Sequence, residues 1–152
     1  FPFALNEVVI HKRDTASMVV VDVHREGTFV NTYWADGLLV STPTGSTAYS
    51  LSAGGPIVLP GSDVVIVTPV APHNLNDRPL VVPLDGEITL VAGGRDASFL
   101  LSMDSRSFPL EPGQEVRIKP AGFRIRLINL EHQDFFSTVR QKMHWGLDPR
   151  ER

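Results

Sequence analysis

The residues best suited to bind a ligand lie in a long uncharged segment that is rich in hydroxyl groups. From Leu38 to Ser62, twenty-five consecutive residues include no Asp, Glu, Lys, Arg or His. Eight of the twelve residues from 41 to 52 carry a hydroxyl group, and Gly54 and Gly55 follow. This order predicts a strand, then a polar loop, then a short helix. The free N–H groups and aligned peptide dipoles at such a helix start favour an anionic ligand.

A nucleotide suits this segment chemically. Hydroxyl groups can pair with ribose or base edges, Tyr49 offers a ring face and a phenolic donor, and Gly45 would let a ligand approach the backbone closely. The segment is not a P-loop, because the lysine of that motif is missing. The residues alone leave an alternative open, in which Ser46 or Thr47 merely caps a structural helix.

Other polar residues elsewhere in the chain are weaker candidates. Asn6 supplies donors and acceptors for a base edge and Glu7 can accept two ribose hydroxyls, although such a pair also often starts a strand. Asp36-Gly37 by itself is typical of a turn, and His73 is interpreted as a hydrogen-bonding loop residue. The five histidines are too scattered to predict a metal centre, and no Gly-x-Ser-x-Gly elbow is present.

The composition excludes several classes of protein. The chain has 152 residues, 42% of them hydrophobic and 20% charged, which fits one globular domain. Its net charge of −3 offers no general attraction for nucleic acid, and no apolar stretch approaches the ~20 residues of a membrane-spanning helix. The absence of cysteine excludes disulfides and is compatible with the cytoplasm, the expected location. The chain begins with Phe1 and shows no signal peptide, so we expect a piece of a longer protein.

Short strands dominate the predicted secondary structure. Runs rich in β-branched and aromatic residues, bounded by turn residues, predict ten strands at 8–12, 18–24, 28–34, 38–41, 64–70, 80–82, 88–92, 99–103, 116–119 and 123–130. Two helices are expected at about 47–53, ended by Gly54, and at about 134–145. This pattern predicts an all-β fold, an antiparallel two-sheet β-sandwich with a short helix after the hydroxyl-rich loop and a C-terminal helix.

Four segments form a distinctive series along the chain: Asn6-Glu7, Asp36-Gly37-Leu38, the run from Ser41 to Pro56, and Pro69-Val70-Ala71-Pro72-His73. In this order they resemble the C-terminal domain of bacterial NAD kinase. Phe135-Phe136 through Leu147 is also similar to the terminal helix of that family. The resemblance covers essentially the whole chain, and its long central motif is specific.

The resemblance implies an enzyme that transfers the γ-phosphoryl group of ATP, or in some members of polyphosphate, to the 2′-hydroxyl of the adenosine ribose of NAD, giving NADP. Residues 1–152 would then form the β-sandwich C-terminal domain, which carries most of the NAD site. The residues that the resemblance implies at the dinucleotide are Asn6, Glu7, Asp36, Thr47, Ala48, Tyr49, Ser50, Leu51, Ser52 and Ala71.

The resemblance also implies partners. The full enzyme would use ATP or polyphosphate with Mg²⁺ or another divalent metal, bind NAD and NADP, and assemble as a homodimer or homotetramer. An N-terminal α/β domain would supply the family's Gly-Gly-Asp-Gly-Thr motif, whose Asp orients or deprotonates the attacking hydroxyl. That motif is absent from these 152 residues, so we expect no turnover by this chain alone and assign it no catalytic residue.

The sequence departs from the family pattern at a few positions. Ser17 and Trp34 stand where other members often carry a histidine or a basic residue, and Arg106 stands in place of a glutamine. No contact is carried over to these three residues. Two other functions stay open at this point: a related lipid or sphingoid kinase, for which an apolar groove would be expected, and a non-enzymatic β-sandwich module that binds a ligand such as a carbohydrate.

Overall fold

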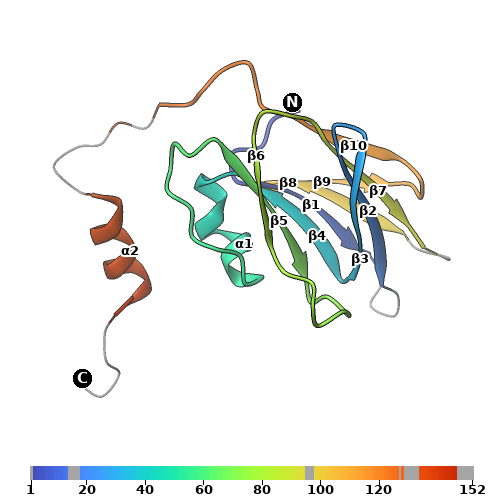
Figure 1. Ribbon diagram of the computed structural model, residues 1–152, viewed down its shortest axis with the longest axis horizontal. Helices are drawn as coiled ribbons and strands as arrows, with labels where there is room; N and C mark the ends of the chain where they lie inside the picture. The colour runs from blue at the N-terminus through green and yellow to red at the C-terminus, as the bar shows by residue number, and fades with distance from the viewer. Residues whose placement is uncertain (1, 14–17, 95–97, 127, 129–133, 147–152) are drawn as a thin grey trace. The chain divides into compact units, whose positions relative to one another are not determined.

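The computed structural model describes residues 2–13, 18–94, 98–126, 128 and 134–146 of the chain. They divide into two compact units, one ending at Ala121 and the other starting at Gly122 (Figure 1). The first unit contains all the strands and the short helices, and the second contains one longer helix.

Ten strands in the first unit form two antiparallel sheets. The six-stranded sheet has the order β6-β5-β4-β1-β8-β9, and the four-stranded sheet has the order β10-β7-β2-β3 (Figure 1). The strand bounds are β1 Glu7–Lys12, β2 Val19–Arg25, β3 Thr28–Ala35, β4 Gly37–Ser41, β5 Val64–Val70, β6 Leu80–Pro83, β7 Ile88–Gly93, β8 Phe99–Met103, β9 Arg106–Leu110 and β10 Glu115–Ile118.

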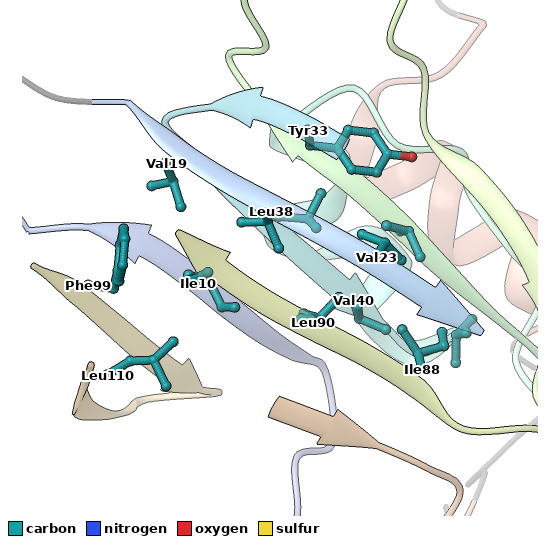
Figure 2. Packing of buried hydrophobic residues seen from close by; sticks show 14 residues of the cluster. Ile10, Val19, Val23, Tyr33, Leu38, Val40, Ile88, Leu90, Phe99 and Leu110 are labelled. Atoms are coloured by element: carbon teal, nitrogen blue, oxygen red, sulfur yellow. The ribbon is translucent and has the colours of Figure 1, made fainter. Parts of the chain in front are cut away.

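The hydrophobic core lies between the two sheets. Along β2 the buried residues Val19, Val21 and Val23 alternate with partly exposed ones, which is the pattern of a strand with one face on a core. Figure 2 shows Val19 and Val23 on the side of β2 that faces the other sheet, with Ile10 and Leu38, and Val21 belongs to the same core cluster. The predicted antiparallel β-sandwich is therefore confirmed.

The six-stranded sheet is also covered on its outer side. All five residues of β4 are buried, so this strand meets protein on both faces. The covering segment follows β4 directly and comprises a 3₁₀ turn, η1 (Thr44–Thr47), and one turn of helix, α1 (Tyr49–Ser52), both of which contact β4. The Ser50 Oγ lies 3.2 Å from the Thr68 Oγ1 of β5, which pins α1 to the sheet.

Several local predictions are confirmed. Arg25-Glu26-Gly27 between two predicted strands predicts a tight hairpin turn, and the β2–β3 hairpin turns at Glu26 and Gly27, both with positive φ. Gly54, with φ of 83°, follows the end of α1 in the left-handed conformation expected of a residue that ends a helix. In the second unit, α2 spans Phe135–Met143, capped by the Asp134 side chain, which accepts from the Ser137 N–H at 2.8 Å.

Other local predictions are wrong. The first helix is split into η1 and a shorter α1, and neither has a side-chain cap, so Ser46 and Thr47 do not cap a helix. The predicted strand at 123–130 is absent from its described residues, 123–126 and 128, because alternating apolar residues do not make a strand without a hydrogen-bonding neighbour. Strand β9 was not predicted, since Pro109 argues against a strand; an edge position tolerates it.

No helix in the described part of the chain is long and apolar enough to cross a membrane.

Gly45 lies against the backbone that precedes β1. A Cβ at this position would stand 2.1 Å from the Asn6 carbonyl oxygen, far inside any normal contact. The Asn6 carbonyl also accepts from the Thr42 N–H at 2.9 Å, and the Thr42 hydroxyl donates to the Leu5 carbonyl at 2.7 Å. Close backbone packing therefore joins the loop after β4 to the start of β1.

We expect Gly45→Ala to lower the free energy of unfolding by about 2 kcal/mol or more, because the methyl group cannot fit without moving the Asn6 backbone. Denaturant unfolding at neutral pH measures this change. The matched control is Gly93→Ala in β7, where a Cβ meets nothing within 4 Å. Equal stability of the two variants would contradict the close packing at Gly45.

Asp104 fixes the same segment from the other side. Its carboxylate accepts from the backbone N–H groups of Leu5 and Asn6 at 2.8 Å and of Glu7 at 3.2 Å. Although burial acts to raise the pKa of Asp104, these hydrogen bonds and the charge of Arg106 lower it below its ordinary 3.8. Asp104 thus favours the folded state in its charged form.

We expect Asp104→Asn to lower the free energy of unfolding at pH 7 by about 1–2 kcal/mol, since hydrogen bonds to a charged acceptor are lost. Because the folded pKa is depressed, the difference from the wild type should stay constant from about pH 7 to 5. It should shrink progressively below about pH 5, where the unfolded carboxyl begins to bind a proton, and be lost once the pH has fallen through the lowered pKa. Urea unfolding across this range, with Glu111→Gln at an exposed carboxylate as control, measures the effect; a wild-type stability at pH 7 would contradict it.

Candidate functional site

The candidate site lies where the covering segment meets β1 and the link between β3 and β4. Asn6 directly precedes β1, and Glu7 is its first residue. Because alternate residues of a strand share a face, Glu7, Val9 and His11 project from the same side of β1. Ile10, on the opposite side, enters the core, so Glu7 and His11 project toward the outer side of the six-stranded sheet, where α1 lies.

Glu7 contacts the start of α1. Its carboxyl group accepts a hydrogen bond from the backbone N–H of Tyr49, the first residue of α1, whose own N-cap residue Ala48 has no side-chain donor or acceptor. The Glu7 carboxylate of β1 therefore caps the start of α1, where a hydroxyl cap from Ser46 or Thr47 had been an open alternative. The pKa of Glu7 is raised by burial first and by the charge of Asp104 second, against the lowering effect of the Tyr49 N–H.

Two neighbouring polar atoms in this region have no hydrogen-bond partner among the described residues. They are the Oε2 atom of Glu7 and the Oγ atom of Ser41, both buried. Glu7 and Ser41 are directly opposite each other in the β1–β4 pairing, so the two side chains share a face of the sheet. Buried polar atoms are normally satisfied, and a second hydrogen-bonding group is therefore expected here.

Tyr49 is held between an aromatic ring and a carboxylate. Its ring stacks on that of His11, with centroids 5.7 Å apart and planes inclined by 19°. Burial, followed by the negative charge of Asp36, raises the pKa of Tyr49, so the phenol is neutral and can donate. Burial lowers the pKa of His11 below its ordinary 6.5, which keeps the imidazole neutral at pH 7.

Asp36 lies in the link between the two sheets. Its carboxylate forms an ion pair with Lys12 of β1 at 2.6 Å, yet 44% of its side chain is exposed. Its backbone N–H donates to the Val70 carbonyl at 2.9 Å. This bond places Ala71, the residue after Val70, close to Asp36. Ala71 is exposed and has φ of 46°, a conformation uncommon for alanine that marks a constrained turn.

The hydroxyl-rich run is divided between the protein interior and its surface. Ser46 and Ser50 are fully buried: the Ser46 Oγ accepts from the Val58 N–H at 3.0 Å, and the Ser50 Oγ pairs with Thr68. Thr47 and Ser52 are exposed, and Ala48, Tyr49 and Leu51 are partly exposed. A ligand on this surface would therefore meet Tyr49 and its exposed neighbours, while the Ser50 side chain faces the sheet.

The glycine in this run has a different role from the one expected. Gly45 was expected to let a ligand approach the backbone closely. In the structure it instead lies against the backbone of Asn6. His11 and Lys12, which contact Tyr49 and Asp36, were not among the residues expected at the site. Asp104 was expected only to match the Asp of a turn in the family pattern, and its contact with the start of β1 was not expected. The run from 7 to 12, Glu-Val-Val-Ile-His-Lys, does not alternate polar and apolar residues, so no local pattern indicated His11.

The three departures from the family pattern are only partly placed. Ser17 lies outside the described residues. Trp34, on the edge strand β3, is 50% exposed, and its carbonyl accepts from the His73 N–H at 2.8 Å. Arg106 donates to the Phe3 carbonyl and lies close enough to Asp104 to lower its pKa.

In the part of the chain that the structure describes, no group of three or more His, Asp or Glu side chains could hold a metal ion. A hollow of about 220 Å³ occurs in the second unit, lined by Phe136, Arg140, Trp145 and Gly146. A far smaller one lies within the sandwich, among Val23, Val67 and their neighbours. Neither is lined by the candidate site residues.

Comparison with known proteins points to one family. Residues 5–130 match the ATP-NAD kinase C-terminal domain. The chain is 48% identical over 148 residues to the NAD kinase of Cytophaga hutchinsonii and 46% identical over 149 residues to that of Bacteroides fragilis. The alignments cover 97% and 98% of this chain but 51% of each relative, so the chain spans about half the length of the curated relatives it matches.

Solved structures that resemble this chain point to the same family. A crystal structure of yeast NADH kinase complexed with NADH superposes with a TM-score of 0.70 at 36% identity, over 75% of this chain and 33% of that one. An NAD kinase from Archaeoglobus fulgidus in complex with ATP gives 0.71 at 33% identity, over 79% of this chain and 46% of that one. None of these relatives is a lipid kinase or a non-enzymatic binding module. The chain belongs to the NAD kinase family and corresponds to its C-terminal domain.

Proposed function

We propose that this chain is the dinucleotide-binding half of an NAD kinase, and that the surface around Tyr49 binds NAD. The observation that carries the proposal is that Glu7, Asp36, Tyr49 and Ala71, from four separate segments, lie near one another: Glu7 accepts from the Tyr49 N–H, the charge of Asp36 acts on Tyr49, and the Asp36 N–H bonds Val70, next to Ala71. These are residues that the family resemblance implies at the dinucleotide, and only the fold brings them together.

The chemistry of these groups suits a dinucleotide that carries its own negative charge. The neutral Tyr49 phenol donates and its ring can stack on a base, while Asp36 accepts from ligand hydroxyl or amino groups. Glu7 lies beside this surface, and its buried Oε2 atom, like the Oγ atom of Ser41, has no partner among the described residues. Asn6, Thr47, Ala48, Ser50, Leu51 and Ser52 complete the proposed surface, with Ser50 acting by holding α1 on the sheet.

The proposed reaction is transfer of the γ-phosphoryl group of ATP or polyphosphate to the 2′-hydroxyl of the adenosine ribose of NAD. This chain would hold and orient the acceptor. The Gly-Gly-Asp-Gly-Thr motif of an N-terminal domain would supply the group that activates the hydroxyl. A divalent metal would enter with the phosphoryl donor, and no step is assigned to a metal ligand of this chain.

The rest of the proposal concerns assembly and location. We propose a homodimer or homotetramer, as the family resemblance implies, in which this chain is joined to its own N-terminal domain. A cytoplasmic location is part of the same proposal, and the absence of cysteine from the sequence permits it.

In the full-length protein, Asp36→Asn and Tyr49→Ala should each raise the KM for NAD about tenfold while changing kcat and the KM for ATP little. Each removes a contact made equally in the ground and transition states, which is worth about 1.4 kcal/mol. Steady-state kinetics with NAD varied at saturating ATP measures both constants.

Lys12→Met is the control for Asp36, because it breaks the ion pair and leaves the carboxylate in place. If Asp36 acts only through Lys12, the two variants will give the same KM. Unchanged kinetics of Asp36→Asn and Tyr49→Ala in a folded protein would remove both residues from the site.

The chain of residues 1–152 on its own should form no detectable NADP from NAD and ATP, because phosphoryl transfer depends on groups that it lacks. An enzymatic assay specific for NADP, with the full-length protein as positive control, measures this. Turnover by the isolated chain above a no-protein blank would contradict the proposed division of labour.

A further inference from the structure

His11 contacts Tyr49 but belongs to none of the residues that the family resemblance implies at the dinucleotide. Tyr49 starts a helix of only four residues, and so short a helix cannot fix its first side chain by its own hydrogen bonds. The contact that orients the Tyr49 ring is the stack on His11, at 5.7 Å and 19°. The position of His11 therefore decides where the Tyr49 ring lies.

His11 lies on a strand that is hydrogen-bonded to a neighbouring strand on each side. Strand β1 is an interior strand, paired over five residues with β4 and over five with β8. The residue opposite His11 on β4 is Gly37, and a Cβ there would come within 3.5 Å of the His11 Nδ1 and 2.8 Å of the Ile10 carbonyl oxygen. The missing side chain at Gly37 leaves room for the imidazole to lie close to the sheet, half-buried beneath Tyr49.

The neighbouring residue on β1 makes a parallel contact. Lys12 is ion-paired with Asp36, so two consecutive residues of one rigid strand hold two residues of the proposed NAD surface. Glu7, at the start of the same strand, bonds the backbone N–H of Tyr49. Tyr49 is thus fixed through both its backbone and its ring by β1.

We infer that His11 is a positioning residue for NAD binding: its ring is the platform that holds Tyr49 in the orientation the dinucleotide meets. This inference rests on the proposed role of Tyr49. It requires a flat ring at position 11 and does not require the imidazole to carry a charge or to touch the ligand. A phenyl ring should therefore replace the imidazole, while a small or non-planar side chain should not.

In the full-length protein, His11→Ala should raise the KM for NAD about three- to tenfold, the range expected for loss of one aromatic contact, with kcat and the KM for ATP within about twofold. His11→Phe should return the KM for NAD to within about twofold of the wild type. His11→Leu, which fills the space without a flat ring, should behave as His11→Ala and serves if that variant does not fold. The matched control is His24→Ala, which removes a ring contact with Phe29 on the other sheet, with centroids at 5.5 Å, and should change neither KM.

The double variant separates this inference from the proposed function. In a Tyr49→Ala background, His11→Ala should cause no further rise in the KM for NAD, because the ring that it positions is gone. An equal rise in both backgrounds, a His11→Phe variant no better than His11→Ala, or a wild-type KM in His11→Ala would each overturn the role of His11. If Tyr49→Ala itself leaves the KM for NAD unchanged, the proposed function of Tyr49 fails and the inference fails with it.

Discussion

Burial of β4 on both faces is the constraint on which the rest of this structure depends. One face of the strand fills the core of the sandwich, and the other lies under the segment that follows it. An unpaired charge cannot be buried at such a place without a large cost. The absence of charge from Leu38 to Ser41 is explained by this burial. The surface for a ligand is built on top of it, at the edge where the covering segment meets β1.

The same constraint explains the unusual density of hydroxyl groups. Ser46 and Ser50 are fully buried and satisfy backbone or side-chain partners beneath the covering segment. Small hydroxyl side chains allow η1 and α1 to lie close to the sheet while still supplying hydrogen bonds. Glu7 combines two tasks, since it caps α1 through the Tyr49 N–H and keeps a second carboxyl oxygen without a partner among the described residues. The Glu7 carboxylate therefore stabilises the fold and also lies beside the proposed ligand surface.

Much of the fold could be predicted from the sequence, because alternating apolar residues and glycine turns act locally. The valines at 19, 21 and 23 and the turn at Glu26-Gly27 are clear examples. The wrong predictions concern segments whose secondary structure depends on residues that are distant in the sequence. The segment 123–126 has strand-like residues but forms no strand, and Pro109 lies in a strand because an edge position does not need its N–H.

Some residues of the candidate site could likewise be predicted from the sequence, and others could not. Tyr49 and Asp36 could be selected by residue type and family resemblance, but their proximity depends on how β1, β4 and α1 pack. His11 and Asp104 act through a ring stack and through backbone N–H groups, and neither contact leaves a mark in the local sequence. Gly45 shows the opposite case, in which a residue typical of a phosphate loop serves backbone packing.

A crystal structure of the full-length protein with NAD bound is the most direct measurement of the central claim. The account predicts that the dinucleotide lies on the outer side of the six-stranded sheet, within hydrogen-bonding or stacking distance of Glu7, Asp36 and Tyr49. Density for NAD on the four-stranded sheet, or at a place where none of these three side chains touches it, would contradict the account.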